Sequence, residues 1–293
     1  RFMEARARAH TGDAIRALDL FVSRHGGGDC KIFGGEPLLV PEVVEAVIRE
    51  APPTVSVYLS TNARNLSRQW FDLLRAHPRV TLTVSIDGRA ADHDGLRRGA
   101  PTHDHVVGLL PDLLSLPRFV VTQTIAPSTA ARAADNFRYL RGLGVRRFNL
   151  LPGYFLPWTD TQLSALRASF SEIATDFEAA WAQGKRLYLR NLFVRAPTPF
   201  YNTGFVVDSD RRIYPNNLVL AGAFDQLRDL SHLGTLDDPP SEERLAAGAA
   251  QVPAVLEATV GAHVMESTRR ADAELTTLCN RLYPSYFSMR QRA

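Results

Sequence analysis

CKIFGGEPLL, at residues 30–39, begins as a short apolar run and then breaks into Gly-Gly-Glu-Pro. An apolar run that ends in two glycines is typical of a buried strand whose carboxyl end turns sharply. Gly34 and Gly35 carry no side chain, so a ligand can approach their N–H and C=O groups closely. Glu36 then adds an anionic acceptor, which suits a cationic amine. The alternative is an ordinary strand-to-helix turn with an exposed glutamate, and the tetrapeptide alone favours neither interpretation.

The composition is that of an ordinary globular protein. The chain has 293 residues, of which 45% are hydrophobic and 22% charged. That length fits one large α/β barrel-like domain, alone or with a small appendage. The net charge is only +3, and no basic run is long enough to follow a phosphate backbone, so we expect no nucleic-acid partner. No apolar run approaches the ~20 residues that span a bilayer, so we expect no membrane partner.

Cys30 and Cys279 are the only cysteines. Two cysteines exclude a disulfide framework and suit a reducing compartment, so we expect a cytoplasmic protein. They also cannot by themselves hold an iron–sulfur cluster through the usual three or four thiolates. Because Cys30 begins a predicted strand, we expect it to be a small buried hydrophobe.

Strands and helices alternate through the first two thirds of the chain. Apolar runs rich in β-branched and aromatic residues predict five strands, at 31–33, 55–60, 80–86, 119–125 and 147–151. Apolar residues at helical spacing predict helices at 11–25, from Pro41, after Ser67, and at 106–114, 130–143 and 159–182. This alternation implies right-handed βαβ units and a parallel sheet. The predicted fold class is therefore α/β, a partial barrel whose first strand is missing.

The pattern changes after about residue 195. Residues 205–208 and 212–214 flank Ser-Asp-Arg and predict a β-hairpin, and residues 241–282 predict helices interrupted at Pro253. We therefore expect a barrel-like domain at 1–195 and a small hairpin-plus-helix extension at 196–293.

Polar residues cluster directly after the predicted strands, where ligands of parallel α/β sheets bind. Their carboxylates suit an amine or a ribose, and their hydroxyls and amides suit a carboxylate or a base edge. Arg97 could grip a carboxylate with two hydrogen bonds. A zwitterionic ligand that carries a ribose fits this set. Besides the Gly-Gly-Glu turn, the candidates are Thr61, Asn62, Ser85, Asp87, Arg97, Gln123 and Asn149.

Each candidate also has a structural interpretation. Thr61-Asn62 can be an N-cap and turn, Asp87-Gly88 a turn dipeptide, and Arg97 one half of a solvated arginine pair. For His93 we favour a structural role, since satisfied histidines outnumber ligands. No single residue distinguishes these interpretations, whereas the ordered series favours a ligand site.

That series resembles the radical S-adenosylmethionine (SAM) enzymes, most closely the branch with SPASM or twitch extensions, which includes peptide maturases and sulfatase-activating enzymes. The resemblance covers about residues 10–220 and rests on KIFGGEPLL at 31–39, STN at 60–62, and VSIDG at 84–88 with His93-Asp94 and Arg97. It implies a partial (β/α)6 barrel that binds SAM.

The resemblance also implies a role for each part of the series. Gly34, Gly35 and Glu36 would receive the amino group of SAM. Thr61, Ser85 and Arg97 would meet its carboxylate or ribose. Residues Asn149 to Leu151 would lie near the adenine.

The family holds a [4Fe–4S] cluster in a Cys-x-x-x-Cys-x-x-Cys loop upstream of Gly-Gly-Glu-Pro, and this chain has no cysteine before Cys30. We expect the loop and the first strand to lie just before Arg1, in a missing N-terminal piece. A protein that has lost the cluster is the alternative.

The extension departs from the family as well. Residues 206–216 resemble the SPASM hairpin, but Asn216 stands where the family usually has cysteine, so we expect no auxiliary cluster. Aromatic residues at 154–158 could line the substrate cleft or could pack at the start of a helix.

The resemblance implies an iron–sulfur oxidoreductase that makes a 5′-deoxyadenosyl radical from SAM and modifies a side chain of a ribosomally made peptide. Its partners would be a peptide or protein substrate, with a small molecule or sugar as the alternative, and an electron donor. Without the cluster loop we expect this chain to be inactive. A second interpretation is a cluster-less partner protein that binds SAM or a peptide.

A third interpretation is a barrel lyase or aldolase, which would need a Schiff-base lysine or metal ligands at strand ends. We rank it last, because Lys31 is predicted to start a strand and Lys185 to follow a helix.

Overall fold

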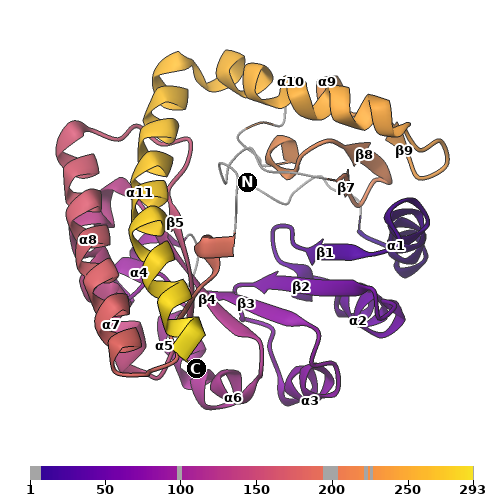
Figure 1. Cartoon of the computed structure of the whole chain (residues 1–293). Helices are drawn as coiled ribbons and strands as arrows, with labels where there is room; N and C mark the ends of the chain where they lie inside the picture. The colour runs from indigo at the N-terminus through magenta and orange to yellow at the C-terminus, as the bar shows by residue number, and fades with distance from the viewer. Residues whose placement is uncertain (1–7, 98–100, 194–203, 221–223, 225–226, 293) are drawn as a thin grey trace. The chain divides into compact units, whose positions relative to one another are not determined.

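The computed structural model of the chain describes residues 8–97, 101–193, 204–220, 224 and 227–292. They form a six-stranded sheet in the order β1-β2-β3-β4-β5-β6 and a three-stranded sheet in the order β7-β8-β9 (Figure 1). The chain divides into two compact units, residues 1–61, 76–81 and 198–261, and residues 62–75, 82–197 and 262–293. These units interleave along the sequence, and the domain boundary expected after residue 195 stays a prediction.

The first unit begins with two parallel strands and their helices. Its N-terminal elements are α1 (Thr11–His25), β1 (Gly28–Ile32), η1 (Pro37–Leu39), α2 (Pro41–Glu50) and β2 (Val55–Thr61). Helix α2 begins at Pro41, whose fixed φ suits the first helical turn, and it buries Val44 and Ile48 among others. β1 and β2 pair in parallel, with Lys31 opposite Tyr58.

The C-terminal elements of the first unit are short strands and one long helix. They are β7 (Val206–Val207), β8 (Arg212–Tyr214), η5 (Asn217–Leu220), α9 (Arg228–Ser231), β9 (Gly234–Thr235) and α10 (Glu242–Val260). β7 and β8 are antiparallel, which confirms the predicted hairpin, and β9 adds a third strand.

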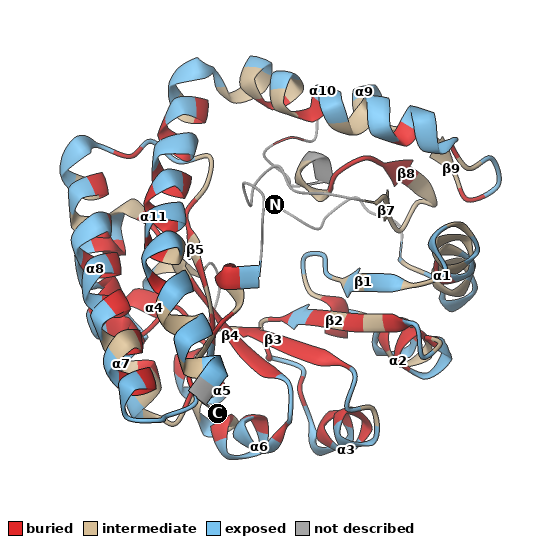
Figure 2. Ribbon diagram, viewed as in Figure 1, coloured by how far each residue is buried: buried red, intermediate tan, exposed pale blue. Residues whose placement is uncertain are grey.

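The second unit carries the remaining strands. Its elements are α3 (Arg68–Ala76), β3 (Thr81–Ser85), α4 (Ala90–Leu96), α5 (His103–Gly108), α6 (Leu110–Ser115), β4 (Phe119–Ile125), η2 (Pro127–Arg132), α7 (Ala133–Gly142), β5 (Arg147–Pro152), α8 (Asp160–Ala182), β6 (Tyr188–Leu189), η3 (Arg190–Phe193) and α11 (Ala262–Arg292). Strands β3 to β6 pair in parallel. Figure 2 shows β3 and β4 buried along almost their whole length.

Aromatic packing forms the core between β5 and the helices that cover it. The ring of Phe137 lies 4.6 Å from that of Phe148 and 5.3 Å from that of Phe177, and all three are fully buried. Helix α11 lies beside α8 (Figure 1), and Arg281 of α11 binds Glu178 of α8 at 2.7 Å. In the described part of the chain, no helix is both long and apolar enough to cross a bilayer.

Two strand predictions need correction. The expectation of five strands is wrong, because Tyr188–Leu189 pairs with the start of β5 as a sixth strand. Two residues are too few to show a period of two. β1 runs from Gly28 to Ile32 instead of 31–33, because Gly28 and Asp29, residue types that are depleted in strands, form its first part.

Two helix predictions also need correction. The helix expected at 106–114 divides into α5 and α6 at Leu109. Pro111, in the first turn of α6, lacks the N–H that a continuous helix needs. The interruption expected at Pro253 lies instead at Gly261, where a φ of 84° ends α10. Pro253 sits inside α10.

Candidate functional site

The turn after β1 is open and carries an anchored carboxylate. Gly34 and Gly35 are exposed, and a Cβ added to Gly34 would meet no atom within 4 Å. Glu36 Oε1 accepts hydrogen bonds from the backbone N–H of Leu38 at 3.0 Å and from the hydroxyl of Thr61 at 2.7 Å. The structure therefore joins Glu36 and Thr61, two predicted site residues that are 25 positions apart.

Asn62 forms a local turn. Its Oδ1 accepts a hydrogen bond from the backbone N–H of Arg64 at 2.9 Å, and Ala63 between them has a φ of 63°. An asparagine that bonds its own backbone two residues on makes an Asx turn. For Asn62, this matches the structural interpretation of the Thr61-Asn62 pair.

Three polar side chains share one face of the second unit's strands. Ser85 lies opposite Thr122, and Thr122 lies opposite Asn149. Residues paired in parallel strands point to the same face of the sheet. The Asn149 amide donates to the Thr122 hydroxyl at 3.2 Å. Leu151 lies opposite Thr124 on the same face, two residues nearer the carboxyl end.

Asp87, just beyond β3, is 2% exposed and bound by protein donors on both oxygens. Arg97 donates from Nε to Oδ2 at 2.8 Å and from Nη2 to Oδ1 at 3.0 Å. The backbone N–H of Thr124 also donates to Oδ1, at 2.9 Å. The structure thus joins two predicted site residues, Asp87 and Arg97, as a bidentate ion pair.

His93 lies next to Asp87 of that ion pair and is 1% exposed. Its Nδ1 accepts a hydrogen bond from the backbone N–H of Asp87 at 3.1 Å, and its Nε2 lies 2.9 Å from the hydroxyl of Thr102. Since Nδ1 accepts, the proton of the neutral ring is on Nε2. Burial is the main cause that lowers the pKa of His93. These contacts agree with the structural role that we favoured.

The lowered pKa of His93 predicts a pH dependence of stability. The groups that act on this pKa are Asp87, Arg97, Asp94 and His103. Below about pH 6.5 the unfolded histidine takes up a proton that the folded ring resists, so the free energy of unfolding falls as the pH falls. Above that pH both states are neutral, and the contribution is constant.

Urea unfolding between pH 7.5 and pH 5 measures this effect. We expect His93→Gln to flatten the dependence relative to the unmodified chain, and the exposed His263→Gln to leave it unchanged. Equal slopes for the His93 variant and the unmodified chain would contradict the prediction.

Gln123 is not brought together with the other candidates. It is 1% exposed, and its Nε2 donates to the carbonyl of Ala133 at 3.1 Å. It lies opposite Leu150, so it points to the sheet face opposite that of Thr122. The period of two along this strand could have separated Gln123 from its polar neighbours.

The position of Lys31 within its strand differs from the prediction. Lys31 is the fourth residue of the five-residue strand β1, so the prediction that Lys31 starts a strand, on which we ranked the lyase or aldolase interpretation last, is wrong.

The loop after β5 is held by α11, a feature that the sequence did not suggest. Tyr154 donates to Asp272 at 2.7 Å, and the N–H of Phe155 donates to the Thr268 hydroxyl at 2.8 Å. Phe155 has a φ of 59°, which is rare for a bulky side chain. A strained backbone persists only where its surroundings fix it, and α11 supplies those contacts.

Thr268→Val should destabilise the second unit by about 1–3 kcal/mol, because the N–H of Phe155 then loses its acceptor. The matched control is Thr277→Val on the same helix, where the exposed hydroxyl bonds only the carbonyl of Ala273. Chemical denaturation compares the two variants, and equal midpoints would contradict the role of Thr268.

The described residues do not fit an iron–sulfur cluster. Among them, no group of three or more His, Cys, Asp or Glu residues could hold a metal ion. Burial raises the pKa of the Cys30 thiol to about 11. Burial and the charge of Asp272 raise that of Cys279 to about 12. Burial thus disfavours the thiolate form of both half-buried cysteines, and the thiolate is the form that ligates a cluster.

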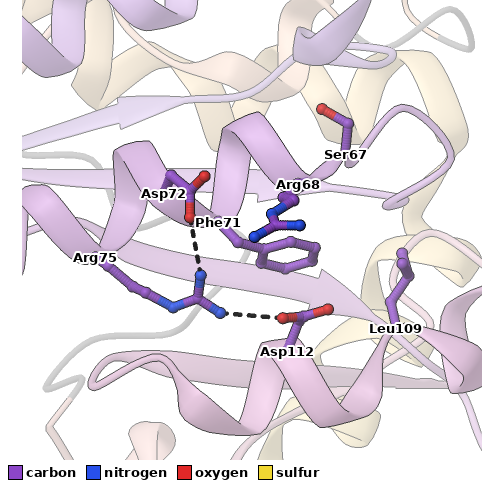
Figure 3. Close-up of a pocket in the computed structure, with 7 residues that line it drawn as sticks. All are labelled: Ser67, Arg68, Phe71, Asp72, Arg75, Leu109 and Asp112. Atoms are coloured by element: carbon purple, nitrogen blue, oxygen red, sulfur yellow. Dashed lines mark hydrogen bonds and ion pairs between the residues drawn. The ribbon is translucent and has the colours of Figure 1, made fainter.

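A separate pocket of about 440 Å³ lies between α3 and α6, and it contains none of the predicted site residues (Figure 3). Arg75 crosses it and pairs with Asp72 at 3.1 Å and with Asp112 at 3.0 Å. Arg75, Asp72 and Asp112 are thus paired at a solvent-exposed surface, and we assign the pocket no function.

Comparisons with known proteins identify the fold. No protein-family model matches the chain, and no curated protein matches its sequence. The structure is similar to that of native anSMEcpe with bound AdoMet (SAM), with a TM-score of 0.65 and 15% identity over 83% of this chain and 73% of that chain.

Two further solved structures are complexes with peptides. One is native anSMEcpe with bound AdoMet and Kp18Cys peptide, with a TM-score of 0.62 and 15% identity over 81% of this chain and 72% of that one. The other is Streptococcus suis SuiB bound to precursor peptide SuiA, with a TM-score of 0.54 and 12% identity over 75% and 56%. The predicted partial α/β barrel is thereby confirmed: the chain has the fold of anSMEcpe and of Streptococcus suis SuiB.

Proposed function

We propose that this chain forms the SAM-binding barrel of a radical SAM enzyme that modifies a side chain of a ribosomally made peptide, and that it binds S-adenosylmethionine at the carboxyl ends of its strands. The observation that best supports SAM binding is the geometry of the turn after β1, in the first unit. There, Glu36 is anchored by Thr61 beside a glycine with open space above it.

In the first unit, we assign the amino group of SAM to Gly34, Gly35 and Glu36. A carboxylate held by two donors is already oriented, so it binds an ammonium group without losing further side-chain freedom. The bare glycine backbone lets the amino-acid part of the ligand approach.

In the second unit, we assign the SAM carboxylate to Ser85 and Arg97, and the adenosine to Asn149 and Leu151. The supporting observation is the polar row of Ser85, Thr122 and Asn149 on one sheet face. SAM supplies the adenosyl group and the sulfonium for radical chemistry, and the protein binds and orients it. The described residues do not fit a cluster, so their role is limited to binding and orienting SAM.

A peptide is the substrate class that the structural neighbours favour, because anSMEcpe with Kp18Cys peptide and SuiB with precursor peptide SuiA share this fold. An electron donor completes the proposed partners, and the two-cysteine composition supports a cytoplasmic site.

Gly34→Val tests the proposal, because the new side chain would occupy the space assigned to the ligand, and its Cβ would meet no protein atom within 4 Å. Isothermal titration of the full chain with SAM should show binding at least about tenfold weaker, with an unchanged unfolding midpoint. Gly12→Val is the matched control, since a Cβ there also meets no atom within 4 Å. No SAM binding by the unmodified chain, or equal binding by Gly34→Val, would refute the assignment.

The 293-residue chain by itself should not cleave SAM, because two cysteines cannot supply the thiolates of a cluster. The measurement is chromatography for 5′-deoxyadenosine after anaerobic reconstitution with iron and sulfide. Formation of 5′-deoxyadenosine above the level of a protein-free control would contradict this prediction.

A further inference from the structure

We propose that Asp87 is a positioning residue that presents the guanidinium of Arg97 to the carboxylate of the bound ligand, and does not itself touch that ligand. The inference rests on the proposed function and sharpens it, since the sequence suggested Asp87 as a direct contact.

The carboxylate of Asp87 is committed to the protein. It is 2% exposed, Oδ2 accepts from Arg97 Nε at 2.8 Å, and Oδ1 accepts from Arg97 Nη2 and from the N–H of Thr124. A buried carboxylate with donors on both oxygens cannot approach a ligand without losing those bonds. Asp87 therefore acts on a ligand only through the residues that it holds.

Arg97 is held but not enclosed. Its side chain is 27% exposed, against 1% for that of Asp87. A guanidinium has five N–H groups in a rigid plane, and Asp87 takes two of them along the Nε–Nη2 edge. Because the guanidinium is planar, these two bonds also fix the direction of the N–H groups on Nη1, which suit a second carboxylate.

The backbone around this pair is fixed as well. The N–H of Asp87 donates to His93 Nδ1 at 3.1 Å, which ties the loop after β3 to α4. Asp94 of the same helix accepts from the N–H groups of Thr102 and His103 at 2.8 and 3.1 Å. Arg97, at the end of α4, thus extends from a helix that is pinned on both sides.

Orientation and simple electrostatics predict opposite effects for Asp87→Asn. The variant removes a negative charge near Arg97, so electrostatics alone would strengthen the binding of a ligand carboxylate. If Asp87 acts by orientation, the variant releases the guanidinium and weakens that binding. The sign of the change therefore separates the two accounts.

The experiment is titration of the full chain with SAM and with decarboxylated SAM, which lacks only the carboxylate. We expect Asp87→Asn to bind SAM about tenfold more weakly and decarboxylated SAM unchanged. Arg97→Ala should show the same selective loss, and the double variant should lose no more than either single variant.

Asp92→Asn is the matched control. Asp92 lies on α4, five residues after Asp87, and holds a different arginine, Arg132, through a similar ion pair. The Asp92→Asn variant should leave the ratio of the affinities for SAM and decarboxylated SAM unchanged. Stronger or unchanged SAM binding by Asp87→Asn would overturn the inference, as would an equal loss of both ligands. Failure of the unmodified chain to bind SAM would instead refute the proposed function.

Discussion

Gly88→Ala is expected to lower the free energy of unfolding of the second unit by about 2–6 kcal/mol, through backbone strain and overpacking. Gly88 has a φ of 143°, and an added Cβ would lie 2.1 Å from Cγ of Asn136. Asn136 cannot move away. It is 2% exposed, it donates to Asp92 at 2.7 Å, and it accepts from the N–H of Arg89 at 3.0 Å.

The control for Gly88→Ala is Gly95→Ala, in α4. A Cβ there meets no atom within 4 Å, and alanine in a helix is more stable than glycine by roughly 0.5–1 kcal/mol. In thermal and urea unfolding, the midpoint of Gly88→Ala should therefore fall below that of the unmodified chain, and the midpoint of Gly95→Ala should rise above it. Similar midpoints for both would show that the turn after Asp87 tolerates a side chain, contrary to the geometry.

Glu36→Gln should weaken the binding of S-adenosylhomocysteine by about 10–100-fold, since a charge-assisted hydrogen bond contributes roughly 1.5–3 kcal/mol. Glutamine keeps an oxygen that can accept from Leu38 and Thr61, so the fold around the turn should persist. Methylthioadenosine carries neither the amine nor the carboxylate, and its binding should not change.

Glu45→Gln is the matched control for that variant. Glu45 lies on the exposed side of α2 and bonds Arg49 at 2.7 Å, so it loses a comparable charge without touching the turn. If Glu36→Gln binds S-adenosylhomocysteine as tightly as Glu45→Gln does, Glu36 does not receive the amine.

The sequence predicted the long elements well, because their signals are local. β4 coincides with the predicted 119–125, where β-branched residues form an uninterrupted run. α8 begins after Thr159, whose side chain forms a capping box with Gln162. Weak local signals explain the failures: β6 has only two residues, and α10 accommodates Pro253 in its interior.

The candidate site was predictable as a set of residues, but not as a set of contacts. Residues after each strand can be named from the order of elements alone. That Asp87 binds the N–H of Thr124, 37 positions away, depends on the register of β3 and β4. The alternation of side chains between the two faces of β4 could have predicted that Gln123 points away from Thr122. The hydrogen bonds between α11 and the loop after β5 could not be predicted, because they join residues more than 100 positions apart.

The contacts between that loop and α11 set an order of assembly during synthesis. Trp158 donates its backbone N–H to the hydroxyl of Ser267, 109 positions later, and the partners of Tyr154 and Phe155 lie later still in the sequence. At 5–20 residues per second, a ribosome needs roughly 5–20 s to produce those partners after the loop itself. The strained turn at Phe155 cannot be held during that interval. The carboxyl end of β5 therefore matures late on the nascent chain, after every strand of the sheet has already been translated.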